Sequence, residues 1–198
     1  MDAADLFVPG PDDPGVPATS GRPSGASGQR RLTLAVWGIG AGVLALDQAT
    51  KALAVASLVE GERTDLVGDL LGLQLLYNPG AAFSLGTGYT VVFTVIMVVV
   101  IGVVFRSARR LGSRGWALVL GLLVGGAAGN LVDRILRDPG PGRGEVVDFI
   151  AYADWFIGNV ADVAIVAAAA GIGLLAVRGI SLDGTRESQQ VAAGDDGA

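Results

Sequence analysis

Four long apolar runs, separated by polar segments, dominate the hydrophobic pattern of this chain. They cover about residues 32–53, 89–105, 116–132 and 159–177. A helix of about 20 residues crosses the roughly 30 Å hydrocarbon core of a bilayer, and neighbouring residues can extend the shorter second run to that length. The pattern therefore predicts four transmembrane helices.

The two long connections, residues 55–88 and 135–158, are too polar to cross a membrane. In the first, leucines alternate imperfectly with polar residues and lead into the turn signal YNPGAAFS at residues 77–84. In the second, VVDFI at residues 146–150 has the composition of a short strand. Turn residues between extended segments of this kind predict a small β element outside the membrane.

Positive charge gathers at one set of helix ends. The connection 106–115 contains four arginines, Arg30 and Arg31 precede the first run, and Arg178 follows the last. Arginine-rich loops of membrane proteins face the cytoplasm. We therefore expect a membrane all-α protein: a four-transmembrane-helix bundle with both termini cytoplasmic and a small extracytoplasmic β element.

The two ends of the chain lack apolar periodicity. Residues 1–29 and 179–198 are rich in small and polar residues, which predicts disordered cytoplasmic tails around a membrane domain at 30–178. The first run has a rival interpretation as a cleaved signal peptide, because residues 54–56 read Ala-Val-Ala. The long leading segment and the charged Asp47 and Lys51 argue against it, and a twin-arginine signal at Arg30 and Arg31 is weaker still.

Composition narrows the possible chemistry. The chain of 198 residues is 51% hydrophobic and contains neither Cys nor His. Thiol nucleophiles, Ser-His-Asp triads and histidine-based zinc sites are thereby excluded, so acid–base work falls to Asp, Glu, Lys or Tyr. The arginines form no basic stripe, and we expect no nucleic-acid partner, no metal and no cofactor.

Polar residues stand where the third run ends and the fourth begins. GGAAGNLVDR at residues 125–134 places Asn130 and Asp133 on one helical face, and GNVAD at residues 158–162 does the same for Asn159 and Asp162. Gly121, Gly125 and Gly129 recur every four residues, a ridge typical of close helix packing. If the two runs form an antiparallel hairpin, the two aspartates meet at the extracytoplasmic surface.

Two aspartates that share a site share a proton as well. One can activate water as a base while the other, protonated, polarises a carbonyl and later protonates the leaving nitrogen, which is aspartic peptidase chemistry. Asn130 and Asn159 would orient the carboxylates, and Arg134 would pin a loop or meet a lipid phosphate. Asp47 and Lys51 have the spacing of a structural ion pair. The competing interpretation of Asp133 and Asp162 is that of ordinary interfacial acids.

Five motifs, taken in order, resemble the lipoprotein signal peptidase (signal peptidase II) family: DQATK at 47–51, YNPGAAFS at 77–84, GNLVDR at 129–134, VVDFI at 146–150 and NVAD at 159–162. The resemblance implies an intramembrane aspartic endopeptidase of the bacterial plasma membrane, which removes signal peptides from diacylglyceryl-modified prolipoproteins by cutting before the lipidated cysteine. It implies Asp133 and Asp162 as the catalytic pair, membrane lipids as surroundings and globomycin as an inhibitor. Residues implied to bind substrate or support the site are Asp47, Lys51, Asn78, Gly80, Asn130, Arg134, Asn159 and Ala161.

Two positions depart from the family pattern. Gly158 stands where Phe usually precedes the second Asn, and Val163 replaces a small polar residue after the second aspartate. Two other functions remain open from the residues alone. A proton-coupled transporter would use intramembrane acids as a relay, although such acids usually lie near the midplane. A noncatalytic membrane scaffold would explain the glycine ridge but not the gathered polar residues.

Overall fold

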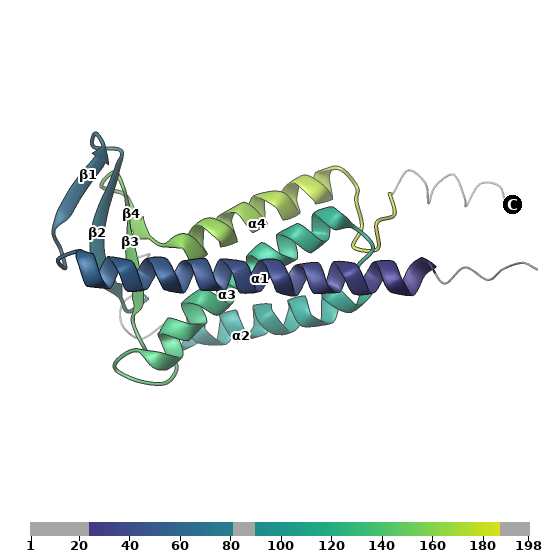
Figure 1. Ribbon diagram of the computed structural model, residues 1–198, viewed down its shortest axis with the longest axis horizontal. Coiled ribbons are helices and arrows are strands. Elements are labelled where there is room, and N and C mark those ends of the chain that lie inside the picture. Colours follow the sequence, from purple (N-terminus) through teal and green to yellow (C-terminus); the bar gives the residue numbers. More distant parts are fainter. Residues whose placement is uncertain (1–23, 81–89, 187–198) are drawn as a thin grey trace, which may run out of the picture.

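The computed structural model describes residues 24–80 and 90–186. In this part of the chain, four helices are long and apolar enough to cross a membrane (Figure 1): α1 (Ser24–Ser57), α2 (Thr90–Ser107), α3 (Arg114–Leu136) and α4 (Val160–Val177). The predicted four-helix membrane bundle is thus confirmed. One boundary differs, because α1 begins at Ser24 rather than near residue 32. The sequence has no proline between residues 24 and 57, so nothing stops the helix from continuing toward the N-terminus.

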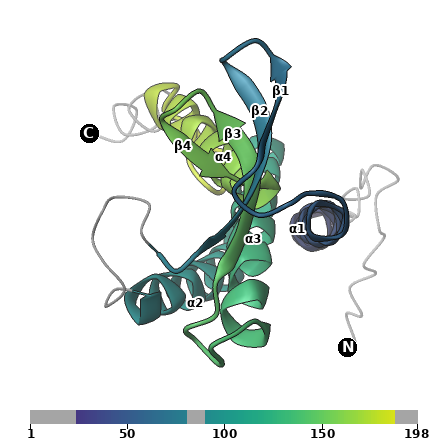
Figure 2. The same cartoon turned by 90° about the vertical axis from the view of Figure 1, so that its left-hand side faces the viewer.

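Helix α3 is the centre of the bundle. It packs against α1, α4 and α2 (Figure 2), and more than half of its apolar stretch is buried, against less than a fifth in each of the other three helices. A cluster of buried residues joins α1, α2 and α3 through Val36, Val104 and Leu120. Many valines and leucines on the other helices face outward, as expected for surfaces in contact with lipid.

The glycine ridge of α3 allows this close packing. A Cβ atom at Gly121 would lie 2.7 Å from Cβ of Ile39, and one at Gly125 would lie 2.6 Å from Cβ of Val43, both in α1. On another face of α3, a Cβ atom at Gly126 would lie 2.6 Å from the carbonyl oxygen of Ala161 in α4. The predicted packing role of the ridge is confirmed, since any side chain here would push the helices apart.

An antiparallel sheet covers one end of the bundle. Its strands, in spatial order, are β1 (Arg63–Val67), β2 (Leu71–Asn78), β3 (Val146–Tyr152) and β4 (Phe156–Gly158). The β2–β3 pairing joins the two long connections, with a shift of register between Leu73 and Leu76. The sheet lies where α1 and α3 end and α4 begins (Figures 1 and 2). The predicted β element and the strand at 146–150 are both present.

The opposite end is closed by the α2–α3 loop, which includes the 3-10 helix η2 (Ala108–Arg110), and by the turn after α4. Gly112 N donates to Leu182 O at 2.9 Å, and Trp116 Nε1 donates to Ile180 O at 2.8 Å. Residues 180–186 are therefore folded against this loop, unlike the disordered tail predicted from residue 179. Three predicted segments lie outside the described residues. They are residues 1–23 of the N-terminal tail, the C-terminal tail after residue 186, and residues 81–84 of the YNPGAAFS motif.

Candidate active site

Asp148 is an acid in the middle of an otherwise apolar strand, β3, opposite Leu76 of β2. Its side chain is only 2% exposed. Oδ2 accepts a hydrogen bond of 2.8 Å from Asn78 Nδ2, and Oδ1 accepts one of 2.6 Å from Asn159 Nδ2. Burial, and after it the negative charge of Asp162, raises the pKa of Asp148 to about 7 despite these two amide bonds. Asp148 can therefore exchange a proton near neutral pH.

Asp162 lies in the first turn of α4 and is held there by a capping box. Asn159 Oδ1 accepts a bond of 3.1 Å from Asp162 N, and Asp162 Oδ2 accepts one of 3.1 Å from Asn159 N. The remaining oxygen, Oδ1, accepts a bond of 2.9 Å from Asn130 Nδ2 of α3. The carboxylate is half-buried, and its place near the N-terminus of α4 favours negative charge.

Two asparagine side chains connect the two acids. Asn159 Nδ2 donates both to Asp148 Oδ1 and, at 3.2 Å, to Asn130 Oδ1, while Asn130 Nδ2 donates to Asp162. Both amides are buried, Asn159 completely. The structure thus brings together Asn130, Asn159 and Asp162 as predicted, but it adds Asp148 as the second acid of the cluster.

A buried ion cluster lies beside this acid–amide network. Lys51 Nζ contacts Asp47 Oδ2 at 2.9 Å and Asp133 Oδ2 at 2.7 Å, and it donates to Asn130 Oδ1 at 2.9 Å. None of the three charged side chains is more than 1% exposed. The predicted ion pair of Asp47 and Lys51 is therefore present. Through Asn130, Lys51 also fixes which way the amide points, so that its Nδ2 faces Asp162.

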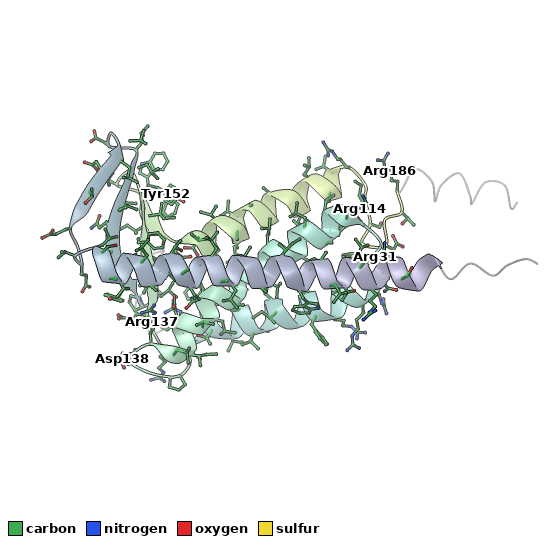
Figure 3. The ribbon with its side chains drawn as sticks, in the orientation of Figure 1. Arg31, Arg114, Arg137, Asp138, Tyr152 and Arg186 are labelled. Carbon is green, nitrogen blue, oxygen red and sulfur yellow. The ribbon has the colours of Figure 1, made fainter. Side chains whose placement is uncertain are left out.

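Besides Lys51, the carboxylate of Asp133 accepts hydrogen bonds from two further groups. Oδ1 accepts a bond of 2.9 Å from Arg137 Nε, and Oδ2 accepts one of 3.3 Å from Val147 N. Both oxygens are therefore occupied by cations and a backbone amide. Arg137 lies at the sheet end of the molecule (Figure 3). Within residues 24–80 and 90–186, no hydrogen bond joins Asp133 directly to Asp162, and Lys51 and Asn130 connect the two side chains.

Arg134 and Asn78 tie the two extramembrane connections together. Arg134 Nη1 donates to Asn78 O at 3.2 Å and to Gly144 O at 2.8 Å, so the guanidinium pins a loop, one of its two predicted roles. Asn78 Oδ1 accepts a bond of 2.8 Å from Gly80 N, and Gly80 has a φ of 108°, a conformation that favours glycine. These contacts hold Asn78 in place beside Asp148.

The start of α4 is built from small residues. Ala161 is fully buried, and its N–H donates to Asp47 Oδ1 at 2.9 Å. Gly158 leaves room beside the catalytic candidate on α4, since a Cβ atom there would lie 3.0 Å from Asp162 Oδ2 and 3.5 Å from Phe156 Cε2. Phe156 thus occupies space next to Gly158, and Val163 is nearly half exposed.

Sequence reasoning missed Asp148, although a signal for it existed. A single acid between Val147 and Phe149 breaks an apolar strand, and such an acid must find polar partners when it is buried. No group of three or more acids in residues 24–80 and 90–186 is arranged to hold a metal ion. The arrangement supports proton transfer between a carboxyl pair and a substrate.

Fold and site together define a multi-pass membrane protein with a buried acid–amide cluster at one end of its bundle. The family described as Signal peptidase (SPase) II matches residues 39–178. The lipoprotein signal peptidase of Rhodococcus jostii (strain RHA1) is 49% identical over 172 residues, covering 86% of this chain and 85% of that one. The lipoprotein signal peptidase of Mycobacterium tuberculosis (strain CDC 1551 / Oshkosh) is 43% identical over 164 residues, covering 83% and 81%.

Two solved structures of bacterial membrane enzymes have the same fold. One is 25% identical with a TM-score of 0.62, covering 71% of this chain and 90% of that one; the other is 26% identical with a TM-score of 0.63, covering 72% and 87%. The chain belongs to the signal peptidase II family and is an aspartic peptidase. None of these comparisons supports the transporter or the scaffold.

Proposed function

We propose that Asp148 and Asp162, rather than Asp133 and Asp162, are the catalytic pair of this peptidase. Its substrates would be diacylglyceryl-modified prolipoproteins, cut before the lipidated cysteine. The observation that carries the assignment is the network that links the two acids through Asn130 and Asn159. Asp133 instead neutralises Lys51 and Arg137.

In the proposed mechanism Asp162 is the base and Asp148 the acid. The N-terminus of α4 favours the negative charge of Asp162, and burial raises the pKa of Asp148 to about 7, so that it holds a proton near neutral pH. Asp162 takes a proton from water, which attacks the scissile carbonyl while Asp148 donates a hydrogen bond to the carbonyl oxygen. As the tetrahedral intermediate collapses, Asp162 gives the proton that it took from water to the leaving nitrogen, and the C–N bond breaks. Asp162 is then again a carboxylate and Asp148 again protonated.

The ion cluster has a positioning role in this mechanism. Lys51 holds Asn130 Oδ1, so Asn130 Nδ2 must face Asp162. Asp47 holds the backbone of Ala161 and thereby the first turn of α4, on which Asp162 is carried. In this mechanism, Lys51 and Asp47 position the acid pair and do not touch the substrate.

A lipid-modified substrate fits a site at this level of the bundle. The outward faces of the spanning helices are apolar, as the exposed Val95, Val99 and Val166 illustrate, so the acyl chains can remain in lipid while the scissile bond reaches Asp148 and Asp162. Globomycin is expected to compete for the same place. Membrane lipids surround the bundle on these faces.

For orientation, we propose that the sheet end faces the extracytoplasmic side and that both termini are cytoplasmic. The start of α1, the end of α2, the α2–α3 loop, the start of α3 and the end of α4 lie at the other end (Figure 1). The arginines of these segments are Arg30, Arg31, Arg106, Arg109, Arg110, Arg114 and Arg178. This charge distribution supports a cytoplasmic position for that end.

A cleavage assay with purified variants tests the acid pair. Asp148→Asn and Asp162→Asn should each lower kcat for a diacylglyceryl-modified precursor by more than roughly 100-fold, the lower bound for losing a general acid or base. Asp133→Asn should retain measurable turnover in whatever fraction remains folded. Asp154→Asn, a fully exposed acid at the same end, is the matched control and should change nothing. Full activity of Asp148→Asn, together with a folded but inactive Asp133→Asn, would refute the assignment.

The lack of cysteine makes the orientation directly testable. Glu62→Cys near β1 and Ser181→Cys after α4 are exposed positions at opposite ends of the bundle. A membrane-impermeant maleimide added to intact cells, with access through the outer envelope, should label Glu62→Cys and leave Ser181→Cys unlabelled until the membrane is opened. The reverse pattern would contradict the proposed orientation.

A further inference from the structure

A cavity of about 580 Å³ lies at the end of the bundle opposite the acid cluster. It opens between the N-terminal part of α1, the α2–α3 loop and the turn after α4. Arg31 and Arg114 lie at this end, far from Arg137 at the sheet (Figure 3). The residues that line the cavity are Gly28, Gln29, Arg31, Leu32, Arg110, Leu111, Gly112, Arg114 and Asp183.

The charge of the cavity is positive. Arg31, Arg110 and Arg114 come from three different elements, and in residues 24–80 and 90–186 none of them forms an ion pair with a carboxylate. The single acid in the lining, Asp183, is engaged within its own turn, where Oδ1 accepts bonds from Thr185 N at 3.0 Å and Thr185 Oγ1 at 2.7 Å. Three guanidinium groups thus face a space with one internally bonded carboxylate.

The walls of the cavity are fixed by hydrogen bonds. Thr33 Oγ1 of α1 donates to Ala108 O of η2 at 2.9 Å, and Gln29 Nε2 donates to Arg109 O. On the other side, the turn after α4 is held to the α2–α3 loop by the bond between Gly112 N and Leu182 O. Hydrogen bonds between separate elements of the folded bundle therefore fix the walls of the space.

The position of the cavity at the ends of the apolar helices indicates which kind of anion it would bind. Helix α2 ends at Ser107 and α3 begins at Arg114, so the arginines lie where the hydrocarbon core gives way to the headgroups. Leu32 and the buried Leu111 form the apolar part of the lining next to the helix core. A ligand with a phosphate and an adjoining apolar portion matches both features.

We propose that this cavity binds the phosphate headgroup of an anionic phospholipid, with Arg31, Arg110 and Arg114 around the phosphate. Basic pockets between transmembrane helices are a known means of binding anionic headgroups. Arginine is suited to this role because its guanidinium offers several donors to phosphate oxygens. The site does not depend on the identity of the catalytic pair, since it lies at the other end of the bundle.

The test is a titration of the purified, delipidated full chain in a neutral detergent with short-chain phosphatidylglycerol, phosphatidylcholine or inorganic phosphate. The test variant is Arg31→Gln/Arg110→Gln/Arg114→Gln. The matched control is Arg30→Gln/Arg106→Gln/Arg178→Gln. It removes the same charge from three arginines at the same end, which are exposed like those of the test variant but do not line the cavity. Cleavage activity and thermal unfolding of both triple variants check that they are folded.

Each basic residue near an anionic headgroup contributes about 5-fold in affinity, so the test variant should lose between about 10-fold and about 100-fold for phosphatidylglycerol. The loss of affinity for phosphatidylglycerol should be at least about 5-fold smaller in the control variant than in the test variant. Phosphatidylcholine should bind weakly to all forms. If the test variant does not fold, Arg110→Gln is compared with Arg106→Gln. Equal losses in test and control variants would overturn the proposal. Displacement of the lipid by an equal concentration of inorganic phosphate would also overturn it, because the site would then be one for free anions.

Discussion

Replacing Lys51 by Met would remove the cation at the centre of the buried ion cluster. Lys51 lies between Asp47 and Asp133, at 2.9 Å and 2.7 Å, and also donates to Asn130. Met has a similar length and shape but no donor. Two buried carboxylates and one amide oxygen would lose their shared partner, and only Arg137 would remain to balance Asp133.

The expected loss in the free energy of unfolding is about 3–5 kcal/mol, the usual cost of leaving a buried charge without its partner. Burial decides this magnitude, because Lys51 and Asp47 are 0% exposed. The comparison variant is Asp65→Asn, which breaks the pair of Arg63 and Asp65 on β1, where the Asp65 side chain is 55% exposed. An exposed pair of this kind contributes about 0.2–1 kcal/mol.

Unfolding by a denaturing detergent, followed by the fluorescence of the three tryptophans, measures both variants on one scale. Adding Asp47→Asn to Lys51→Met should recover part of the loss, with a coupling energy of about 1–3 kcal/mol in the double-mutant cycle. Lys51→Met should also lower kcat, because the side-chain oxygen of Asn130 would then be held only by the bond from Asn159 Nδ2. A loss no larger than that of Asp65→Asn, with no coupling to Asp47, would show that the cluster does not stabilise the bundle as described.

The remaining predictions concern pH and helix packing. Because burial raises the pKa of Asp148 from 3.8 to about 7, the folded protein binds a proton that the unfolded chain releases. The free energy of unfolding should therefore fall as the pH rises from about 4 to about 7, and this fall should be smaller in Asp148→Asn. The kcat for cleavage should fall above about pH 7, where Asp148 loses the proton it donates, and a flat kcat profile to pH 9 would contradict its role as acid. Gly125→Ala should destabilise the bundle by about 1–3 kcal/mol, because the new methyl group would lie 2.6 Å from Cβ of Val43. Gly38→Ala is the control: its methyl group meets nothing within 4 Å, so it should be neutral or slightly stabilising. Equal effects of the two substitutions would rule out the packing role of Gly125.

Local features of the chain were predictable because they depend on neighbours in sequence. Four apolar runs gave four spanning helices, and the spacing of Asp47 and Lys51 gave an ion pair that the structure contains. The four-residue repeat of Gly121, Gly125 and Gly129 gave a close helix contact. Each of these patterns is repeated or closed within a few turns of one helix, so helix geometry alone fixes which side chains share a face.

The proposed partner of Asp162, Asp148, was not predictable in this way. Asp133 and Asp162 flank the same connection and end up at the same end of the bundle, which made them the natural pair by topology. The side chains of Lys51 and Arg137 then determine where the carboxylate of Asp133 points. Asp148 reaches the cluster because β3 pairs with β2, which places it beside Asn78 from a distant part of the chain.

The sequence by itself determined the membrane bundle, the β element at its end and most of the polar residues that meet there, Asp148 excepted. Only the tertiary structure decided how those residues are divided between an ion cluster and an acid–amide network, and that the turn after α4 closes a basic cavity at the other end. The physical reason is that hydrophobic periodicity fixes the place of a helix but not the choice among several buried partners. That choice depends on distances of about 3 Å between side chains from separate elements, which are set only when the whole bundle packs.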